Sequence, residues 1–380
     1  MENKFDAYQR VLEKYKEEKR FRNIPPDREI PGRIDLSGND YLGLAADSFL
    51  RLTAEEAASL SFSSSASRIL ASRQNAHLDL ENMLSELYGR PALLFNSGYH
   101  ANVGCISALN IPGTVFLTDK LIHASVIDGL AMAGASYARW RHNDIASLKR
   151  LLLKYQDNSE RMIVVAESIY SMDGDLAPLP DLIMLKREFP SMILYLDEAH
   201  AFGVRGKRGL GLSEELGLTE DVDIIIGTLG KACASSGAFV ITSDLMKSFF
   251  INNSRSLIFS TALPPAVAYW TSRMIERIVK MEREREKLAV ISKEFRNFIA
   301  QITGSPNPSE SQIVPLMVGD ASKALEIASA LDKAGIDALA IRRPTVPPGG
   351  ERIRFSLHAS LSSAELGKVM DEIKICFAQT

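Results

Sequence analysis

Two short apolar runs, at 192–196 and 223–227, constrain the fold of this chain most, because each ends abruptly in polar and charged residues. These residues are Asp197, Glu198 and His200 after the first run, and Thr228 and Lys231 after the second. The 34 residues that separate Asp197 from Lys231 (231 − 197 = 34) leave room for a loop and the next strand of the same sheet. In an open α/β sheet, ligands bind outside the carboxyl ends of the strands. The sequence therefore predicts that an acid, a histidine and a lysine meet at one reaction centre.

This set of residues suits pyridoxal 5′-phosphate (PLP). Its aldehyde needs a lysine amine, its ring nitrogen needs a carboxylate, and its phosphate needs hydroxyls and backbone N–H groups. Residues 91–109 read as a strand, a glycine turn and a helix, which places free N–H groups and the positive end of a helix dipole at 97–100. The tetrapeptide DEAH (197–200) also occurs in nucleotide-driven motors, but their GxxxxGK[ST] phosphate loop is absent from this sequence.

Seven motifs resemble the α-oxoamine synthase family of fold-type I PLP enzymes, in the order that the family has them. They are NDYLGL (39–44), FNSGYHAN (95–102), HAS (123–125), ESIYSMDGDLAPL (167–179), DEAHAFGVRGKRGLG (197–211), GTLGKA (227–232) and RRPTVPPGGERIRFSL (342–357). One segment departs from the family. Where a glycine-rich GSGGSR is usual, this chain has serines and an alanine at 63–66, which match glycine in size but not in its freedom at positive φ.

The resemblance implies a cofactor site with ten members. They are Gly98, Tyr99, His123, Ser171, Asp197, His200, Thr228, Lys231, Ser260 and Thr261. Four of them are expected to be catalytic. Lys231 holds the cofactor and removes the α-proton, while Asp197 keeps the ring nitrogen protonated. His123 stacks on the ring, and His200 together with Ser171 holds the phenolic oxygen.

The resemblance also implies substrate residues, namely Arg22, Asn39, His123, Arg342 and Thr345. Arg22 is expected near the acyl substrate, although Arg20 is equally placed by spacing. Arg342 is expected to bind the substrate carboxylate and Thr345 the acyl group, and Arg343 is an alternative to Arg342.

The implied reaction condenses an amino acid with an acyl thioester and releases carbon dioxide and the thiol. The loop RPTVPPG followed by ERIRFSL resembles the oxononanoate synthase branch, which joins L-alanine to a pimeloyl thioester, on coenzyme A or a carrier protein, in biotin synthesis. Two other branches stay open, one that uses glycine and acetyl-CoA and one that uses serine and palmitoyl-CoA. A non-catalytic scaffold of the same fold is an alternative of another class, against which Lys231 argues.

Composition narrows the class of partner. The formal charge of −3 and the pI near 6.1 give no reason to invoke nucleic acid or an anionic membrane surface, so small molecules are the expected ligands. The three cysteines form neither a CxxC pair nor a disulfide pattern, and the charged amino terminus has no apolar signal-peptide core. We therefore expect a cytoplasmic enzyme with no resident metal.

Seven expected strands, alternating with helices, predict an α/β fold with a mostly parallel seven-stranded sheet and a small C-terminal α+β domain. The strands are expected at 92–96, 115–118, 136–140, 162–166, 192–196, 223–226 and 238–242. Further helices are expected up to about residue 19, over 45–60 and over about 266–302. We divide the chain into an N-terminal helix and linker (1–38), a large PLP-binding domain (39–275) and a small domain (276–380). The family implies a homodimer with its active site at the subunit interface.

Overall fold

The computed structural model describes residues 3–24, 32–47, 52–72 and 74–378. Contacts between residues divide the chain into two compact units. The large unit is Asn39–Ser171 with Asp175–Leu288, and the small unit is Met1–Gly38 with Met172–Gly174 and Ala289–Thr380. The domain boundaries expected from the sequence stay a prediction, because compact contacts do not test whether a segment folds alone. Most of the proline-rich linker expected after the first helix, at 25–31, lies outside the described residues.

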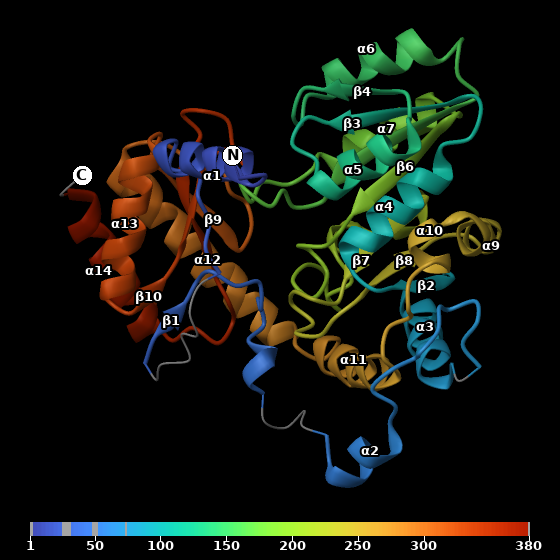
Figure 1. The fold of residues 1–380 in the computed structure, drawn as a ribbon, viewed down its shortest axis with the longest axis horizontal. Helices are drawn as coiled ribbons and strands as arrows, with labels where there is room; N and C mark the ends of the chain where they lie inside the picture. Colours follow the sequence, from blue (N-terminus) through green and yellow to red (C-terminus); the bar gives the residue numbers. More distant parts are fainter. Residues whose placement is uncertain (1–2, 25–31, 48–51, 73, 379–380) are drawn as a thin grey trace. The chain divides into compact units, whose positions relative to one another are not determined.

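The large unit is built on a seven-stranded sheet with the strand order β2-β8-β7-β6-β5-β3-β4 (Figure 1). The strands are β2 (Ala92–Phe95), β3 (Thr114–Asp119), β4 (Tyr137–Trp140), β5 (Arg161–Glu167), β6 (Met192–Asp197), β7 (Ile224–Thr228) and β8 (Ala238–Ile241). Strand β8 pairs antiparallel with β2 and β7, and the other neighbours pair in parallel. The predicted fold class is therefore confirmed, and all seven strands lie where the sequence predicts them.

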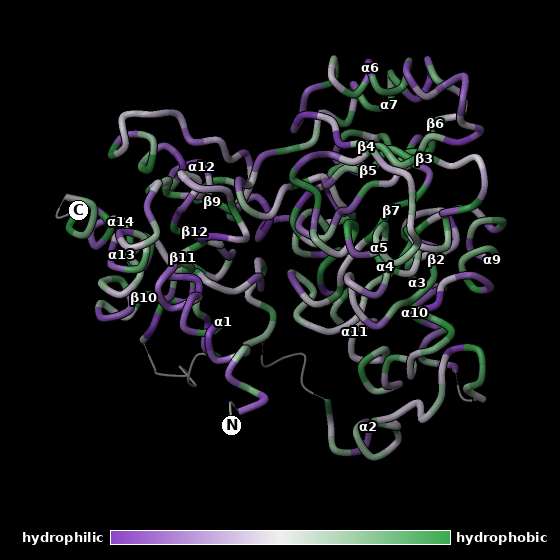
Figure 2. Tube along the Cα trace, turned by 45° about the horizontal axis from the view of Figure 1, so that its top comes forward, coloured by the Kyte–Doolittle hydropathy of each residue, from purple (hydrophilic) through white to green (hydrophobic). Residues whose placement is uncertain are grey.

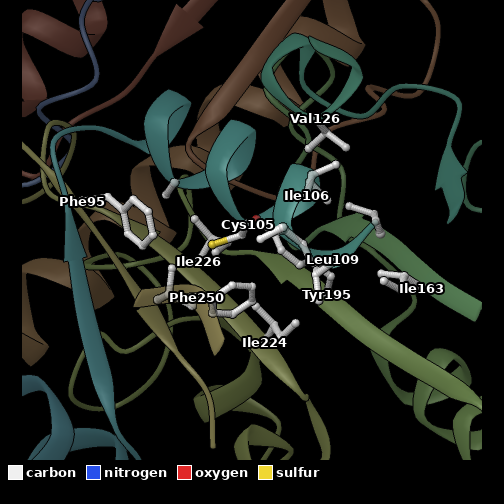
Figure 3. Packing of buried hydrophobic residues seen from close by; sticks show 14 of the residues in the cluster. Phe95, Cys105, Ile106, Leu109, Val126, Ile163, Tyr195, Ile224, Ile226 and Phe250 are labelled. Atoms are coloured by element: carbon white, nitrogen blue, oxygen red, sulfur yellow. The ribbon is translucent and has the colours of Figure 1, made fainter. Parts of the chain in front are cut away.

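Helices cover the sheet because most of its strands are apolar and buried on both faces. They are α3 (Asn75–Tyr88), α4 (Gly98–Leu109), α5 (Ala124–Ala133), α6 (Ile145–Tyr155), α7 (Leu179–Glu188), α9 (Asp244–Asn253) and α11 (Pro265–Ile278), with short helices α2 (Ala54–Ser59), α8 (Leu212–Glu215) and α10 (Arg255–Ile258). Helices α4 and α5 pack on each other and on the sheet, where Cys105, Val126 and Tyr195 belong to one buried cluster (Figure 3). Hydrophobic residues gather around β3 and β5 in the colouring of Figure 2.

The small unit contains a three-stranded antiparallel sheet in the order β11-β12-β9 and a two-stranded parallel pair, β1 with β10. These strands are β1 (Ile34–Asp35), β9 (Ile313–Met317), β10 (Ile336–Asp337), β11 (Leu339–Ile341) and β12 (Arg352–Ser356). Its helices are α1 (Asp6–Glu17), α13 (Ala321–Lys333) and α14 (Ser363–Ala378), and α12 (Glu282–Thr303) enters it from the large unit. The predicted α+β class of this part is confirmed.

Two helix predictions are wrong in extent. The stretch predicted over 45–60 contains a 3₁₀ turn at Leu44–Ala46 and then α2, and its residues 48–51 lie outside the described residues. Helix α2 begins only at Ala54, because Thr53 and Glu56 form a capping box there. The stretch predicted over 266–302 is two helices, α11 and α12. The Arg285 guanidinium donates a 2.6 Å hydrogen bond to the carbonyl of Ile278, the last residue of α11, and so stabilises the end of that helix. Over the described chain, we find no helix with both the length and the apolarity that a bilayer crossing requires.

Candidate active site

Lys231 follows β7 in a tight loop and forms one end of a hydrogen-bonded chain. Its Nζ lies 2.8 Å from His200 Nε2, and His200 Nδ1 lies 2.7 Å from the Tyr41 hydroxyl. That hydroxyl donates to Asn39 Oδ1 at 2.9 Å. Because the Tyr41 proton points to Asn39, the proton between Tyr41 and His200 belongs to Nδ1, which leaves Nε2 as an acceptor for the amine of Lys231. The structure thus joins three predicted site residues in one chain, with Tyr41 as their link.

The backbone holds this lysine loop closely. Ala234 adopts a positive φ of 47°, and its N–H donates to the carbonyl of Lys231 at 2.8 Å. Gly203, in the loop after DEAH, has a φ of 83°, and a Cβ there would lie 2.6 Å from the Cβ of Ala232. Only glycine lets the two loops approach this closely. Both loops are therefore fixed around the lysine.

Asp197, at the end of β6, is buried and held at both carboxylate oxygens. Oδ1 accepts from the N–H of Ala199 at 2.9 Å, and Oδ2 accepts from the side-chain amide of Asn102 at 2.8 Å. The same amide donates to Ser125 Oγ at 2.9 Å, and Ser125 lies 2.7 Å from His123 Nδ1. Asn102 therefore connects the predicted ring-nitrogen partner, Asp197, to the predicted stacking residue, His123.

Burial and neighbouring charges shift the pKa values of Glu167 and His123 in this site. Glu167 pairs with Asp197 across β5 and β6, and burial, reinforced by the charge of Asp197, raises the pKa of Glu167 well above its usual range. Its Oε1 has no hydrogen-bond partner among the described residues. Burial lowers the pKa of His123, Asp197 raises it less, and Lys231 lowers it further. Burial thus favours the neutral forms of both Glu167 and His123.

The residues predicted to bind the cofactor phosphate lie close together at the start of α4. Ser97 caps this helix, with its Oγ accepting from the N–H of His100 at 3.2 Å. A Cβ at Gly98 would lie 3.6 Å from Thr228 Oγ1, so the helix start faces the end of β7. The Asn96 amide donates to Ser260 Oγ at 3.2 Å and to the carbonyl of Thr261 at 2.5 Å. Four predicted phosphate residues from three segments therefore meet at one helix N-terminus.

The remaining two predicted cofactor residues are Tyr99, in α4, and Ser171, in the turn after β5. The hydroxyl of Tyr99 donates to Asp128 at 2.8 Å, and its side chain is half exposed. Ser171 is half buried in the turn after β5. The roles of both residues stay predictions.

The predicted substrate residues of the small unit form their own group. Arg22 Nη2 donates to Thr345 Oγ1 at 3.0 Å, and Arg342 Nη2 donates to the carbonyl of Phe21 at 3.0 Å. Arg20, the alternative to Arg22, is engaged by Glu18 at 2.7 Å. These bonds tie the segment after α1 to the loop after β11.

Sequence reasoning missed four residues of these networks: Tyr41, Asn102, Ser125 and Glu167. Each lies inside a motif that the sequence singles out. The motifs thus contained these residues, but motif spacing alone does not show that the packing of α4 brings Asn102 to Asp197.

The comparisons with known proteins identify the family of this chain. A family model described as aminotransferase class I and II matches residues 31–373. The chain belongs to this family. A relative from Haemophilus ducreyi, named 8-amino-7-oxononanoate synthase, is 44% identical over 343 residues, which are 88% of this chain and 89% of that protein. The resemblance to α-oxoamine synthases is thereby confirmed.

Two solved structures share the fold of this chain. A variant of the serine palmitoyltransferase from S. paucimobilis, solved with bound PLP and myriocin, has a TM-score of 0.90 at 26% identity and covers 99% of this chain and 98% of its own. The 8-amino-7-oxononanoate synthase of Francisella tularensis has a TM-score of 0.79, with coverage of 92% and 99%, and shares the fold at 24% identity.

Proposed function

We propose that this chain is a PLP-dependent acyltransferase that condenses L-alanine with a pimeloyl thioester and so forms 8-amino-7-oxononanoate for biotin synthesis. The observation that carries the proposal is the lysine of GTLGKA, whose amine lies 2.8 Å from His200 beside a buried and doubly bonded Asp197. The 44% identity to a relative of that name supports the choice of branch.

The residues present fit PLP. Asp197 is an acceptor whose oxygens are fixed, the start of α4 offers N–H groups next to two hydroxyl-bearing segments, and Lys231 supplies the amine. PLP, when bound, supplies an electron sink for the α-carbon of the amino acid. Each group that this chemistry needs from the protein is thus available in the large unit.

The protein residues have separate tasks in this proposal. Lys231 takes the α-proton at Nζ, and His200 orients that amine through Nε2. Asp197 would pair with the ring nitrogen of bound PLP and favour its protonated form. The neutral ring of His123 offers an aromatic face without a competing charge. In the small unit, Arg22, Arg342 and Thr345 bind the acyl thioester.

Free-thiol release tests the branch, with L-alanine plus pimeloyl-CoA, glycine plus acetyl-CoA, and serine plus palmitoyl-CoA assayed side by side. We expect release to be fastest with the first pair, slower with the second and slight with the third. A methyl group contributes about 1–3 kcal/mol to a pocket, so the preference for alanine over glycine is clear without being absolute. Palmitoyl lacks the terminal carboxylate that the cations of the small unit would pair with.

The control is Lys231→Ala, which should abolish release with every pair while leaving the circular dichroism spectrum unchanged. Fastest release with glycine plus acetyl-CoA would replace the proposed substrates with those of threonine degradation. Release with none of the three pairs, together with no visible absorbance after loading with PLP, would favour the scaffold alternative. We further propose that the enzyme acts in the cytoplasm as a homodimer.

A further inference from the structure

A charged network surrounds His142, which lies in the loop between the edge strand β4 and α6 (Figure 1). Its Nδ1 lies 2.9 Å from Asp119 Oδ1, and its Nε2 lies 2.7 Å from Asp175 Oδ2. The side chain of Asp119 is fully buried, and those of His142 and Asp175 are mostly buried. Because ionised carboxylates only accept hydrogen bonds, both ring nitrogens donate, and His142 bridges the two acids as a cation.

The bond to Asp175 holds the turn that carries Ser171, the residue expected to contact the phenolic oxygen of the cofactor. Within this turn, the carbonyl of Asp175 accepts from the N–H of Tyr170 at 3.0 Å. The ring of Tyr170, directly before Ser171, packs edge-on against His142, with 4.5 Å between the ring centroids. His142 thus fixes the turn both by a charged hydrogen bond and by a ring contact.

Asn143, the next residue, makes the same connection a second time. Its side-chain amide donates to Asp175 Oδ2 at 2.7 Å and to the carbonyl of Leu176 at 2.9 Å. Its backbone N–H donates to Asp119 Oδ2 at 3.0 Å. Asn143 adopts a φ of 50°, a conformation that asparagine tolerates better than most residues. The loop after β4 is therefore bound both to the end of β3 and to the turn after β5.

Stability alone does not account for this network. Taking two charges out of water costs about as much as their attraction returns, so a buried ion pair is weak evidence for stability. Three buried oxygens in the network have no hydrogen-bond partner among the described residues, and each such group lowers stability. They are Oδ1 of Asn143, Oδ1 of Asp175 and the hydroxyl of Tyr170. What the network specifies is the placement of the turn.

We propose that His142 is a positioning residue of the cofactor site, which acts through Asp175 and Tyr170 to hold Ser171 in place. The proposal deepens the proposed function and rests on its assignment of PLP to this site. Asp119 holds the imidazole from the side of β3, because its carboxylate is itself fixed by the N–H of Leu121 at 2.7 Å. Neither acid is among the predicted cofactor residues, so His142 acts on the cofactor only through the turn.

The first test is the affinity for PLP, which needs no turnover. Visible absorbance after dilution of the loaded protein gives the dissociation constant. In His142→Asn, the amide can replace Nδ1 toward Asp119, but the donor to Asp175 is lost. We expect His142→Asn and Ser171→Ala each to raise the constant about tenfold, equivalent to about 1.4 kcal/mol. The double variant should bind PLP no more weakly than Ser171→Ala alone, because residues that act through one another are not additive.

Arg90→Gln is the matched control for lost stability. Arg90 donates to the carbonyls of Val222 and Asp223 at 2.7 and 2.8 Å, at the amino end of β7 and so at the opposite end of the sheet from the site. This variant should also melt at a lower temperature, but without a change in the dissociation constant of PLP. Three results would each overturn the proposal: unchanged affinity in His142→Asn, equally weakened affinity in Arg90→Gln, or weaker binding in the double variant than in Ser171→Ala.

The second test is the visible circular dichroism of the bound cofactor, measured at PLP concentrations that saturate every variant. His142→Asn should change this spectrum in the same sense as Ser171→Ala, whereas Arg90→Gln should match the wild type. A spectrum of His142→Asn that equals that of the wild type would count against positioning. Coupling of His142 to Ser171 in a protein that releases no thiol would leave the positioning role assigned and refute the proposed reaction, while thiol release without coupling would refute the positioning role alone.

Discussion

At the scale of single residues, Asp197 at the end of β6 and His123 at the start of α5 are linked through one buried amide and Ser125. Asn102 donates to Asp197 and to Ser125, and its own Oδ1 accepts from the hydroxyl of Tyr195 at 2.7 Å. A buried amide satisfied on both sides fixes its partners, because any other orientation would leave a polar group unpaired. The carboxylate of Asp197 is thus positioned before a ligand binds.

Replacement of Asp197 tests the role of that carboxylate. Asp197→Asn should still bind PLP, because Lys231 and the phosphate residues are unchanged, but it should lose the ion that keeps the ring nitrogen protonated. We expect a loss of about 10³-fold or more in kcat, equivalent to about 4 kcal/mol of barrier. Thiol release gives kcat and visible absorbance gives cofactor occupancy. Turnover near that of the wild type would mean that another residue holds the ring nitrogen.

His142 is a second residue whose charge depends on its partners. Its Nδ1 lies 2.9 Å from Asp119, which is fully buried, and its Nε2 lies 2.7 Å from Asp175. Burial by itself lowers the pKa of His142, but the two carboxylates outweigh it and raise the pKa to about 10. The raised pKa makes the charged form stabilise the folded state. That stabilisation is complete below the unfolded pKa of about 6.5 and is lost as pH rises toward about 10.

We therefore expect the free energy of unfolding to fall between pH 6.5 and 10, with a contribution from His142 of at most about 1.4 kcal/mol per pH unit. Urea titrations at pH 6.5, 8 and 9.5 measure it. The variant His142→Gln should be less stable than the wild type at pH 6.5, and the difference should shrink as pH rises. Groups that titrate in both proteins cancel in that difference. A constant difference across the range would show that His142 is neutral in the folded protein.

At the scale of elements, strands were more predictable from the sequence than helices. Most strands of the large sheet are apolar runs between polar loops, and this signal is local; β4, which contains Arg139, is an exception. The break between α11 and α12 is not local, because the Arg285 guanidinium makes it together with the carbonyls of Ile278 and Lys207. The candidate site shows the same contrast between local sequence signals and contacts between distant segments. Motifs predict which residues take part, whereas the links through Tyr41 and Asn102 depend on how distant segments pack.

The serine-rich segment that replaces the family's glycines gives a prediction at this scale. Ser65 adopts a φ of 50°, a region that costs a residue with a Cβ about 1 kcal/mol. Ser65→Gly should raise the free energy of unfolding by about 0.5 kcal/mol, because glycine relieves that strain but loses more chain entropy. Ser63→Gly is the control, since Ser63 is not among the residues with positive φ and should lose stability. Urea midpoints compare the two, and the expectation fails if both variants lose stability.

At the scale of the whole molecule, the large unit exposes three large apolar side chains on two hydrogen-bonded segments, which we call the apolar patch. Phe62 and Leu70 are 68% and 78% exposed, and Phe259 is 71% exposed. Their two segments are bonded together, with the N–H of Ala262 donating to the carbonyl of Ala66 at 2.9 Å. Ser260 and Thr261, which we assign to the phosphate, lie in the second segment. Grouped apolar side chains of this kind mark a protein interface, which fits the predicted homodimer with its site at the interface.

A matched pair of substitutions tests this prediction. Leu70→Arg places a charge in the patch. Light scattering should give twice the chain mass of 41.9 kDa for the wild type, a dimer, and one chain mass for the variant, a monomer. Burying an unpaired guanidinium costs several kcal/mol, which exceeds what a few apolar contacts return. Leu245→Arg is the control, because Leu245 is 77% exposed on α9, outside the patch, and should leave the mass unchanged. The rate of thiol release should fall in Leu70→Arg as the dimer dissociates, because the predicted active site lies at the subunit interface. A wild-type protein that scatters as one chain at micromolar concentration would refute the dimer, and a dimer unaffected by Leu70→Arg would place its interface elsewhere.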